Sequence, residues 1–389
     1  MLLSGFYIYI ISFILTEQEI IYTMALTRIK GLGLSNSRIL YERMGCAAAV
    51  FDNRKSLRDF MPDVSDKLLK ALSDVDEAIS RAEQEFSFIA RNHLRVLCFN
   101  DSDYPWRLRE CADSPLVLFY AGTADLNHSR IINMVGTRHC TDYGRDICNS
   151  FVADLCRYYP DTIIVSGLAY GIDINAHRSA LSSGMPTVAV LAHGLDRIYP
   201  TMHRQTASDM VAHGGGLLTE YMSATKPDKG NFVRRNRIVA GMCDATIVVE
   251  SASSGGALIT ADLATSYNRD VLAFPGRVYD QYSEGCNALI RSGRAALIQS
   301  AEDLINALCW KNPLENSTRE PVQQELFPEF SPEEQAIIDT LKSVDDKQIN
   351  QIVVDTNMPY SKVSSLLFDL EMKGIVRVLG GARYRLIHR

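Results

Sequence analysis

The stretch TIIVSGLAYGIDINAHRSAL, residues 162–181, decides which fold the chain adopts. It begins with a β-branched run, passes through a turn that contains Gly167 and Gly171, and ends in a segment with helical spacing. A buried strand that leads through glycines into a helix is typical of doubly wound α/β folds. Because the first turn of a helix leaves backbone N–H groups unpaired, we expect this turn to bind an anion. A nucleotide, a sugar phosphate and the backbone of a nucleic acid all remain candidate ligands.

The alternation of strand and helix continues on both sides of this stretch. Short apolar or β-branched runs alternate with helical segments, which predicts a mainly parallel sheet covered by helices. In such sheets the ligand binds at the carboxyl ends of the strands. The expected strands are residues 131–135, 162–165, 187–191, 217–219, 245–249, 271–274 and 295–298, and the expected helices between them include 143–158, 174–183 and 256–267.

Two smaller regions flank this central domain, which we place at residues 91–310. Residues 16–90 have helical spacing and contain IKGLG at 29–33, a turn similar to those of helix–hairpin–helix or SAM-like domains. A small helical domain with a tight turn explains the same pattern, so DNA binding by Arg28, Lys30 and Arg38 stays open. Residues 311–330 predict a linker, since the stretch 311–332 contains four prolines. Residues 331–389 predict three helices and a hairpin, which together make a winged helix.

Composition limits the classes of function. A chain of 389 residues should hold more than one domain, and its net charge of −6 confines any polyanion site to a local patch. Nine scattered cysteines without C-x-x-C spacing indicate reduced thiols in a cytoplasmic protein rather than structural zinc. Residues 1–15 are apolar but lack a basic start and a cleavage site. We expect an over-extended start there and no membrane contact, with an anchoring or interfacial segment as the alternative.

Glycine-bearing loops and one cationic segment mark the expected ligand-binding edge. Four loops follow expected strands, at residues 135–138, 166–171, 250–256 and 274–276. The cationic segment is KPDKGNFVRRNR, residues 226–237, with five cations and one acid. Phe232 within it suits base stacking, and Arg138 comes from another loop at the same edge. The alternative is that Phe232 packs against the core and the arginines are merely solvated.

Motifs that would indicate an enzyme are mostly missing. The chain contains no G-x-x-x-x-G-K-[ST], no G-x-S-x-G and no H-E-x-x-H, and its histidines lack metal-ligand spacing. We therefore expect no catalytic residue, no metal and no cofactor. Four acidic residues near strand ends are expected to cap helices or to pair with arginines: Asp173, Asp196, Glu220 and Glu250.

A series of ordered motifs across the central domain resembles the DprA/Smf family of DNA-processing proteins. The series includes VGTR at 135–138, IVSGLAYGID at 164–173, RNRIVAG at 235–241 and FPG at 274–276. Further blocks place the resemblance between Tyr104 and Ala295. So many blocks in the same order make the match specific, and both flanking regions also suit the family.

The resemblance implies an extended Rossmann-like domain that binds single-stranded DNA and loads the RecA recombinase onto it. It also implies a role in natural transformation and recombination, usually as a homodimer, without catalytic turnover. By matched position, Arg138 and Lys229 are expected to hold phosphates, and Phe232 to take a base. The full set of expected DNA contacts is Gly136, Arg138, Ser166, Gly167, Gly171, Lys229, Phe232, Arg234, Arg235, Asn236, Arg237, Ser254, Gly255 and Asn287.

Two rival functions remain open. A nucleotide-binding or nucleotide-hydrolysing enzyme of a related Rossmann-like fold would use the same loops, although the P-G-G-x-G-T-x-x-E loop of such enzymes is absent. A transcription regulator would act through the winged helix. Its expected reading helix, residues 360–372, offers Lys362 against Asp369 and Glu371, which is a poor set for reading base edges. We expect a protein-contact or auxiliary DNA role for this domain.

Overall fold

The computed structural model describes residues 16–311, 330–342, 347–379 and 382–386. They belong to two compact units, Met1–Leu314 and Glu315–Arg389. The apolar stretch 1–15, nearly all of the expected linker and the expected wing turn at 380–381 lie outside the described residues. Among the described helices, none combines the length and the apolar character that crossing a bilayer requires.

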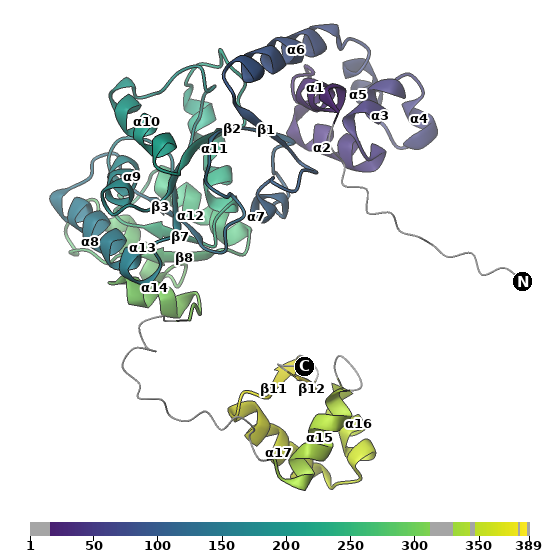
Figure 1. Cartoon of the computed structure of the whole chain (residues 1–389), viewed down its shortest axis with the longest axis vertical. Coiled ribbons are helices and arrows are strands. Elements are labelled where there is room, and N and C mark those ends of the chain that lie inside the picture. The colour runs from purple at the N-terminus through teal and green to yellow at the C-terminus, as the bar shows by residue number, and fades with distance from the viewer. Residues whose placement is uncertain (1–15, 312–329, 343–346, 380–381, 387–389) are drawn as a thin grey trace, which may run out of the picture. The chain divides into compact units, whose positions relative to one another are not determined.

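A nine-stranded sheet forms the centre of the first unit (Figure 1). Its strands are β1 (Arg95–Cys98), β2 (Val117–Gly122), β3 (Ile131–Val135), β4 (Ile163–Ser166), β5 (Thr187–Val190), β6 (Gly216–Thr219), β7 (Ala245–Val248), β8 (Asp270–Ala273) and β9 (Ala296–Leu297). They lie in the order β1-β2-β6-β5-β4-β3-β7-β8-β9. The strands from β6 to β9 in this order pair in parallel, as expected, whereas β1 and β2 extend the sheet with antiparallel pairs.

The chain runs from β3 outward through β4, β5 and β6, then returns to place β7 on the other side of β3. The strand order therefore reverses between β3 and β7. In open α/β sheets, ligands bind beyond the carboxyl ends of the strands at such a reversal. The topology thus directs attention to the loops that follow β3, β4, β7 and β8.

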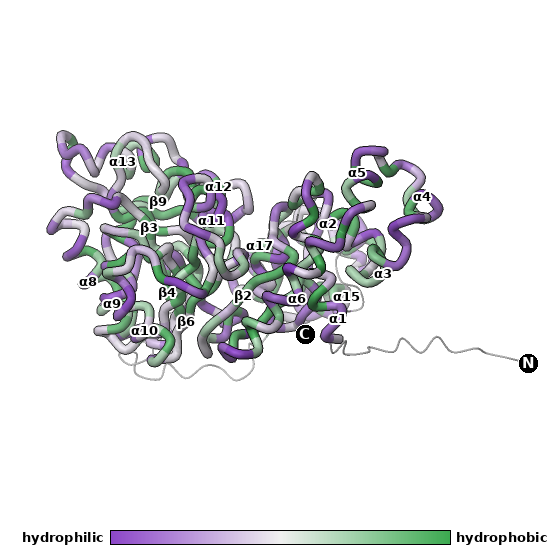
Figure 2. The backbone as a smooth tube through the Cα atoms, turned by 90° about the horizontal axis from the view of Figure 1, so that it is seen from above, coloured by the Kyte–Doolittle hydropathy of each residue, from purple (hydrophilic) through white to green (hydrophobic). Residues whose placement is uncertain are grey.

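Helices cover both faces of the sheet. They are α7 (Trp106–Arg109), α8 (Asp142–Tyr158), α9 (Ile172–Ser182), α10 (Arg204–Ala212), α11 (Lys229–Gly241), α12 (Gly256–Ser266), α13 (Glu284–Arg291) and α14 (Ala301–Ala307). Because side chains alternate along a strand, Ile132 and Met134 pack toward α8 and α9, while Ile131 and Val135 share the opposite core with α11 and α12. Figure 2 shows the resulting hydrophobic colour along the strands.

Six helices precede the sheet: α1 (Glu17–Leu26), α2 (Gly33–Met44), α3 (Ala47–Asp52), α4 (Leu57–Phe60), α5 (Asp66–Ala71) and α6 (Asp76–Arg91). The IKGLG turn joins α1 to α2, and both of its glycines have left-handed φ angles. Lys30 in this turn pairs with Glu77 at 2.7 Å. Arg38 on α2 donates to the Cys111 carbonyl and to the Ser114 hydroxyl at 2.7 Å. Two of the three cations considered for DNA binding at this turn therefore have protein partners.

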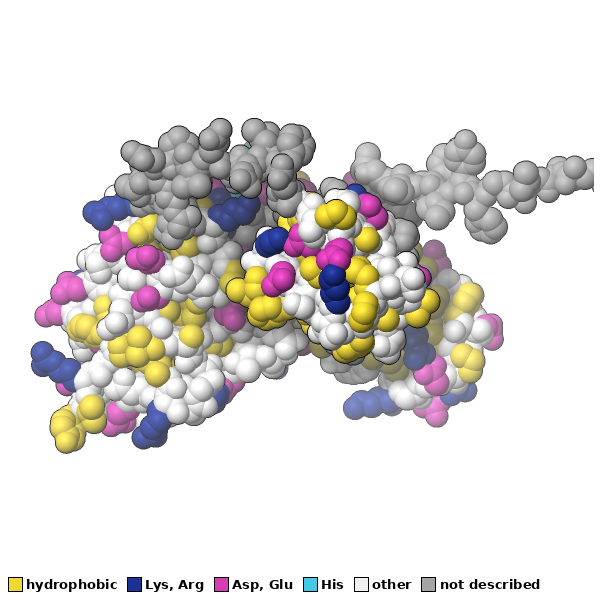
Figure 3. Space-filling model, turned by 90° about the horizontal axis from the view of Figure 1, so that it is seen from below, with side chains coloured by type: hydrophobic (Ala, Val, Ile, Leu, Met, Phe, Trp, Pro, Cys, Tyr) yellow, Lys and Arg dark blue, Asp and Glu magenta, His cyan; other side chains and the backbone are white. Residues whose placement is uncertain are grey.

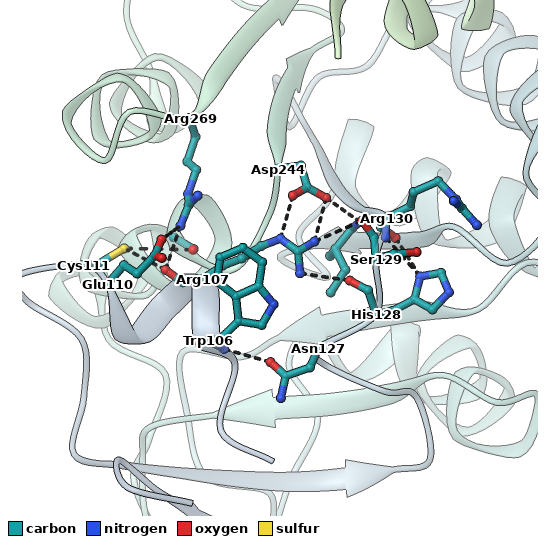
Figure 4. A network of polar contacts seen from close by, with 12 residues as sticks. Trp106, Arg107, Glu110, Cys111, Asn127, His128, Ser129, Arg130, Asp244 and Arg269 are labelled. Carbon is teal, nitrogen blue, oxygen red and sulfur yellow. Dashed lines mark hydrogen bonds and ion pairs between the residues drawn. The ribbon is translucent and has the colours of Figure 1, made fainter. Parts of the chain in front are cut away.

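A buried arginine closes the amino edge of the sheet. Arg107 on α7 is 3% exposed, and its Nε donates to Oδ1 of Asp244 at 2.6 Å (Figure 4). Its Nη1 donates to the His128 carbonyl at 2.9 Å, and Nη2 donates to the Ser129 carbonyl at 3.1 Å. Asp244 also accepts from the backbone N–H of Ile131 at 2.9 Å. This network ties α7 to the beginnings of β3 and β7.

The second unit is a winged helix. It contains α15 (Pro332–Lys342), β10 (Lys347–Gln348), α16 (Ile349–Thr356), α17 (Tyr360–Met372), β11 (Val376–Leu379) and β12 (Arg383–Leu386). The strands form a sheet in the order β10-β12-β11, and its core includes Ile337, Ile352, Val363 and Leu367. The three expected helices and the hairpin are confirmed.

Helix α17 occupies the position of a reading helix but exposes apolar side chains. Tyr360, Phe368 and Met372 are all exposed along it. Its one lysine, Lys362, pairs with Glu333 of α15. The helix therefore presents apolar side chains and one paired lysine, and its protein-contact or auxiliary DNA role stays a prediction.

Candidate nucleic-acid interface

Three side chains from separate segments meet above the carboxyl ends of β3 and β5. Arg138 follows β3, and its guanidinium carbon lies 5.3 Å from the ring centroid of Phe232 on α11. Tyr199, in the loop after β5, has its ring centroid 5.8 Å from that of Phe232. Arg138 and Tyr199 are exposed, and Phe232 is partly exposed. A surface cation beside two rings can hold a phosphate next to an unpaired base.

Helix α11 presents further candidate contacts on the same side. Its N-cap residue Asp228 accepts from the Gly230 N–H at 2.8 Å and so fixes where the helix begins. Lys229, Phe232 and Asn236 follow at intervals of three and four residues, which places them on one face. Asn236 Nδ2 donates to the carbonyl of Gly256 at 3.3 Å, at the start of α12. This α11 face therefore connects the loops that follow β3, β5 and β7.

Arg235 points into the protein, which corrects the expectation that it contacts DNA. It is 4% exposed, and its Nη1 donates to the carbonyls of Gly167, at 2.6 Å, and of Val190. Burial raises the pKa of the nearby Asp173 carboxyl, and the Arg235 guanidinium opposes that shift. Since its donors already serve buried carbonyls, Arg235 supports the loop after β4 from inside.

Arg237 and Ser166 are also turned inward. Arg237 forms an ion pair with Glu220 and donates to the carbonyl of Asp113 at 2.7 Å. The Ser166 hydroxyl is buried and donates to the carbonyl of Met134 at 2.6 Å. The expectation of DNA contact through these two side chains is corrected for the same reason as for Arg235.

The glycine turn after β4 allows close packing. A Cβ on Gly167 would lie 2.3 Å from Arg235 Nη2, and a Cβ on Gly171 would lie 2.1 Å from the Thr137 carbonyl oxygen. Three of the first four N–H groups of α9 already donate to nearby carbonyls: Ile172 to Thr137, Ile174 to Ala169 and Asn175 to Gly171. The expected anion cradle at this turn is therefore largely filled by the protein itself. The turn instead brings α9 against the loop that carries Arg138.

Glu250 occupies the crevice between β3 and β7. It is buried, and its carboxylate accepts from the N–H of Thr141 at 2.9 Å and from the hydroxyl at 2.5 Å. Thr141 is the N-cap of α8, so the carboxylate lies at the positive end of that helix. A Cβ on Gly144 would lie 2.1 Å from Glu250 Oε2, so only glycine allows this approach. A nucleotide phosphate placed here would meet a like charge.

Two further acidic residues pair with arginines, as expected. Glu220 pairs with Arg237, and Asp196 pairs with Arg197 while accepting from the Ala224 N–H at 3.0 Å. Groups of three or more His, Cys, Asp or Glu that could hold a metal ion are absent from the described residues.

The remaining expected contacts lie in two places. Ser254 and Gly255 are exposed immediately before α12, whose first turn faces solvent beside Asn236. Asn287 lies elsewhere, because its side-chain amide binds both the N–H and the carbonyl of Gly276, at 3.1 Å and 3.0 Å. Asn287 therefore holds the loop after β8, and its contact with DNA stays a prediction. Gly136 packs closely against the side chain of Ile172.

Sequence reasoning missed the tyrosines at this edge. Tyr199 stands beside Phe232, and Tyr170 is exposed, with its ring centroid 5.2 Å from that of His203. Both follow strands that were predicted, in loops rich in glycine and proline. An aromatic residue in such a loop could have indicated an exposed ring available for base stacking, because a buried ring more commonly lies within the strand itself.

Comparison with known proteins gives a consistent result. The model of the DNA recombination-mediator protein A family matches residues 95–309, and that of the DprA winged helix domain matches residues 318–382. DNA processing protein DprA of Streptococcus pneumoniae is 40% identical over 205 residues, which cover 53% of this chain and 71% of that protein. The putative DprA of Mycobacterium tuberculosis strain H37Rv is 34% identical over 322 residues, which cover 79% and 81%.

A solved structure agrees. The X-ray structure of S. pneumoniae DprA aligns with a TM-score of 0.61 and 30% identity, covering 74% of this chain and 97% of that one. The Helicobacter pylori DNA processing protein A, described for its single-stranded DNA binding mode, aligns with a TM-score of 0.49 and 29% identity, covering 56% and 95%. With a family model over more than half of its length and a fold to match, this chain belongs to the DNA recombination-mediator protein A (DprA/Smf) family.

Proposed function

We propose that this protein binds single-stranded DNA along the α11 face, with Arg138 and Lys229 on phosphates and Phe232 against a base. The observation that carries the proposal is the exposed Arg138 guanidinium, 5.3 Å from the Phe232 ring. Among the described residues, Arg138 and Lys229 have no ion-pair partner, so their charges are free for a ligand. The family to which the chain belongs supports DNA as that ligand.

The geometry favours a single strand over a duplex. Stacking on Phe232 and Tyr199 requires the flat face of a base, and in a duplex those faces are covered by neighbouring base pairs. The exposed start of α12, at Ser254 and Gly255, adds unpaired N–H groups to which a neighbouring phosphate can bind. Because Glu250 already occupies the start of α8, this arrangement suits a polynucleotide better than a hydrolysable nucleotide in the β3–β7 crevice.

The finer parts of the proposal rest on family membership. The bound strand is protected and passed to the RecA recombinase in recombination and natural transformation, and the protein acts as a homodimer without catalytic turnover. The cytoplasm is the proposed compartment, and nine unpaired cysteines suit its reducing conditions. RecA filament formation on single-stranded DNA, with and without this protein, measures the transfer step directly.

The first experiment measures binding of fluorescent oligo-dT and of its duplex across a range of salt concentrations. Single-stranded affinity should exceed duplex affinity and fall with salt at a log–log slope of about 0.7 per phosphate contacted. Arg138→Ala/Lys229→Ala should bind far more weakly, with a slope shallower by ~1.4 because two phosphate contacts are lost. Phe232→Ala should lose affinity by ~1–3 kcal/mol with an unchanged slope.

Arg157→Ala is the matched control for charge removal. Arg157 is exposed near the end of α8, at the opposite edge of the sheet, where it pairs with Asp154 at 3.0 Å. It should bind as the wild type does. The proposal would be wrong if the wild type did not bind single-stranded DNA. It would also be wrong if the double variant kept the full salt slope, since DNA would then not contact Arg138 and Lys229.

A further inference from the structure

A hollow lies beyond Arg138, at the carboxyl ends of β7 and β8. Its volume of about 890 Å³ is within the range of known small-ligand sites. The start of α8, Glu250 and the loop after β8, residues 275–282, form its walls. None of the fourteen expected DNA contacts lines this hollow.

The loop after β8 is a fixed wall. Three hydrogen bonds hold it: Tyr143 Oη to the Pro275 carbonyl at 2.5 Å, Ser251 N–H to the Tyr282 carbonyl at 2.6 Å, and Asn287 Nδ2 to the Gly276 carbonyl at 3.0 Å. They come from three different segments, α8, the loop after β7 and α13. These bonds hold Pro275, Gly276 and Tyr282 at the two ends of the loop, so Tyr282 has a defined position beside the hollow.

Two rings connect this hollow to the α11 face. The imidazole of His139 stacks on the ring of Tyr282, with centroids 6.0 Å apart and planes 23° apart. His139 directly follows Arg138, and its N–H donates to the Thr137 hydroxyl at 3.1 Å. The N–H of Thr137 in turn donates to the carbonyl of Glu250 at 2.8 Å. The pair Arg138–His139 is therefore a fixed ridge, with Phe232 on one side and Tyr282 on the other.

The lining carries three carboxylates, Asp142, Glu250 and Asp280, and one arginine, Arg277. These charges suit a base inside the hollow and a phosphate only beside Arg277. Asp142 pairs with Arg145 at 2.7 Å, and Glu250 is bound by Thr141. Arg277 at the rim is exposed and has no ion pair within the described part of the chain. Carboxylate oxygens of the lining can accept a hydrogen bond from a base N–H, such as N3–H of an unpaired thymine, as they accept from the amino group of cytosine.

We propose that this hollow is a second nucleobase subsite on the same DNA strand. A strand that crosses the Arg138–His139 ridge places one base against Phe232 and a following base against Tyr282 and His139. The phosphate between them lies over Arg138, and Arg277 holds the next one. The inference rests on the proposed function, since it extends the same strand past the α11 face.

The test compares oligo-dT strands of increasing length. Tyr282→Leu should leave the shortest bound strand unaffected, because that strand fills only the α11 face. On longer strands it should bind about 5- to 150-fold more weakly, the equivalent of ~1–3 kcal/mol of stacking for one base. Tyr282→Phe should bind like the wild type, because it keeps the ring. Strands carrying 4-thiothymidine should cross-link to the peptide 275–287 in the wild type.

The outcomes separate this inference from the proposed function. If the wild type binds single strands and Tyr282→Leu binds equally well at every length, the proposed second subsite is wrong. The proposal that DNA binds along the α11 face is then unaffected. Cross-links confined to the Phe232 peptide would lead to the same conclusion. A wild type that binds no single-stranded DNA overturns both. Thermal melting of each variant excludes unfolding as the cause of a loss.

Discussion

The two edges of the parallel sheet use arginine in opposite ways. At the amino edge, Arg107 is buried and bonded to Asp244 and to two carbonyls (Figure 4). At the carboxyl edge, Arg138 is exposed over the ring of Phe232 and has no ion pair among the described residues. The difference teaches that an arginine marks a binding surface here only when its donors are unused.

Helix α11 repeats this difference between adjacent residues. Arg234 is exposed, whereas Arg235 is buried beneath the Gly167 loop. Charge counts do not distinguish them. On the face of the molecule in Figure 3, positive and negative side chains are interspersed.

The largest expected effect is a loss of stability when the buried arginine at the amino edge is replaced. Arg107→Ala should lower the free energy of unfolding by ~3–5 kcal/mol, because it leaves Asp244 and two carbonyls without their partner. Affinity for oligo-dT of the folded protein should not change. Denaturant unfolding and binding measured on the same sample check both parts. Arg157→Ala, which breaks an exposed pair with Asp154, should cost no more than ~1 kcal/mol. An Arg107→Ala protein of normal stability would contradict the comparison.

A second pair of variants sharpens the contrast within α11. Arg235→Met should lower the free energy of unfolding by ~2–4 kcal/mol, since two buried carbonyls lose their donor, and should leave the salt slope of DNA binding unchanged. Lys229→Met, at an exposed position of the α11 face, should keep stability within ~0.5 kcal/mol and reduce the slope by ~0.7, the value for one phosphate. Thermal melts and salt titrations provide the two measurements. If Arg235→Met reduced the salt slope and left stability unchanged, Arg235 would contact DNA and the contrast would be wrong.

The smallest expected effect is a pH dependence of stability, and it tests whether side chains beneath the carboxyl edge are buried as fully as Arg107 is at the amino edge. His177 on α9 is fully buried, and its Nδ1 lies 2.7 Å from the Thr187 hydroxyl. That hydroxyl donates to the Ile164 carbonyl, so His177 Nδ1 must be the donor to it. Nε2 is buried with no partner in the described structure. Burial therefore lowers the pKa of His177 to about 3.

The direction in which stability changes with pH follows from the difference in proton binding between the folded and unfolded chains. Below pH ~6.5 the unfolded chain binds a proton at His177 that the folded chain refuses, so stability is lost as the pH falls toward 3. Between pH 7.5 and pH 5 the loss should be ~1–2 kcal/mol. His177→Gln should remove that part of the pH dependence, while His213→Gln at an exposed position should keep it. Denaturant unfolding at several pH values measures it, and identical profiles for all three proteins would contradict the assignment.

Local patterns predicted much of the fold. The run 131–135 is β3 as expected, and the remaining expected strands were placed within two residues of their observed bounds. These strands are continuous apolar runs that end in glycine loops, so each carries its own signal. Residues 94–98 and 117–120 were also expected to be strands, and they are β1 and β2. Their place in the sheet order could not be predicted, because strand pairing at an edge depends on residues far apart in the chain.

The candidate site could be predicted only in part. Arg138, Lys229 and Phe232 remain predicted contacts with exposed or partly exposed side chains, whereas Arg235, Arg237 and Asn287 use their donors within the protein. The resemblance gave the family and its ligand, and the residue types gave a cationic, aromatic segment after a strand. Neither distinguishes two adjacent arginines.

The sequence by itself determined the alternating strands and helices, the basic segment 226–237 and the winged helix, because these depend on neighbours within a few residues. Only the tertiary structure decided which polar groups remain unused. Arg235 meets Gly167, and Glu250 meets Thr141, across long separations in the chain. A donor is free for DNA only if no buried carbonyl or carboxylate has come within hydrogen-bonding distance, and packing alone brings those groups together.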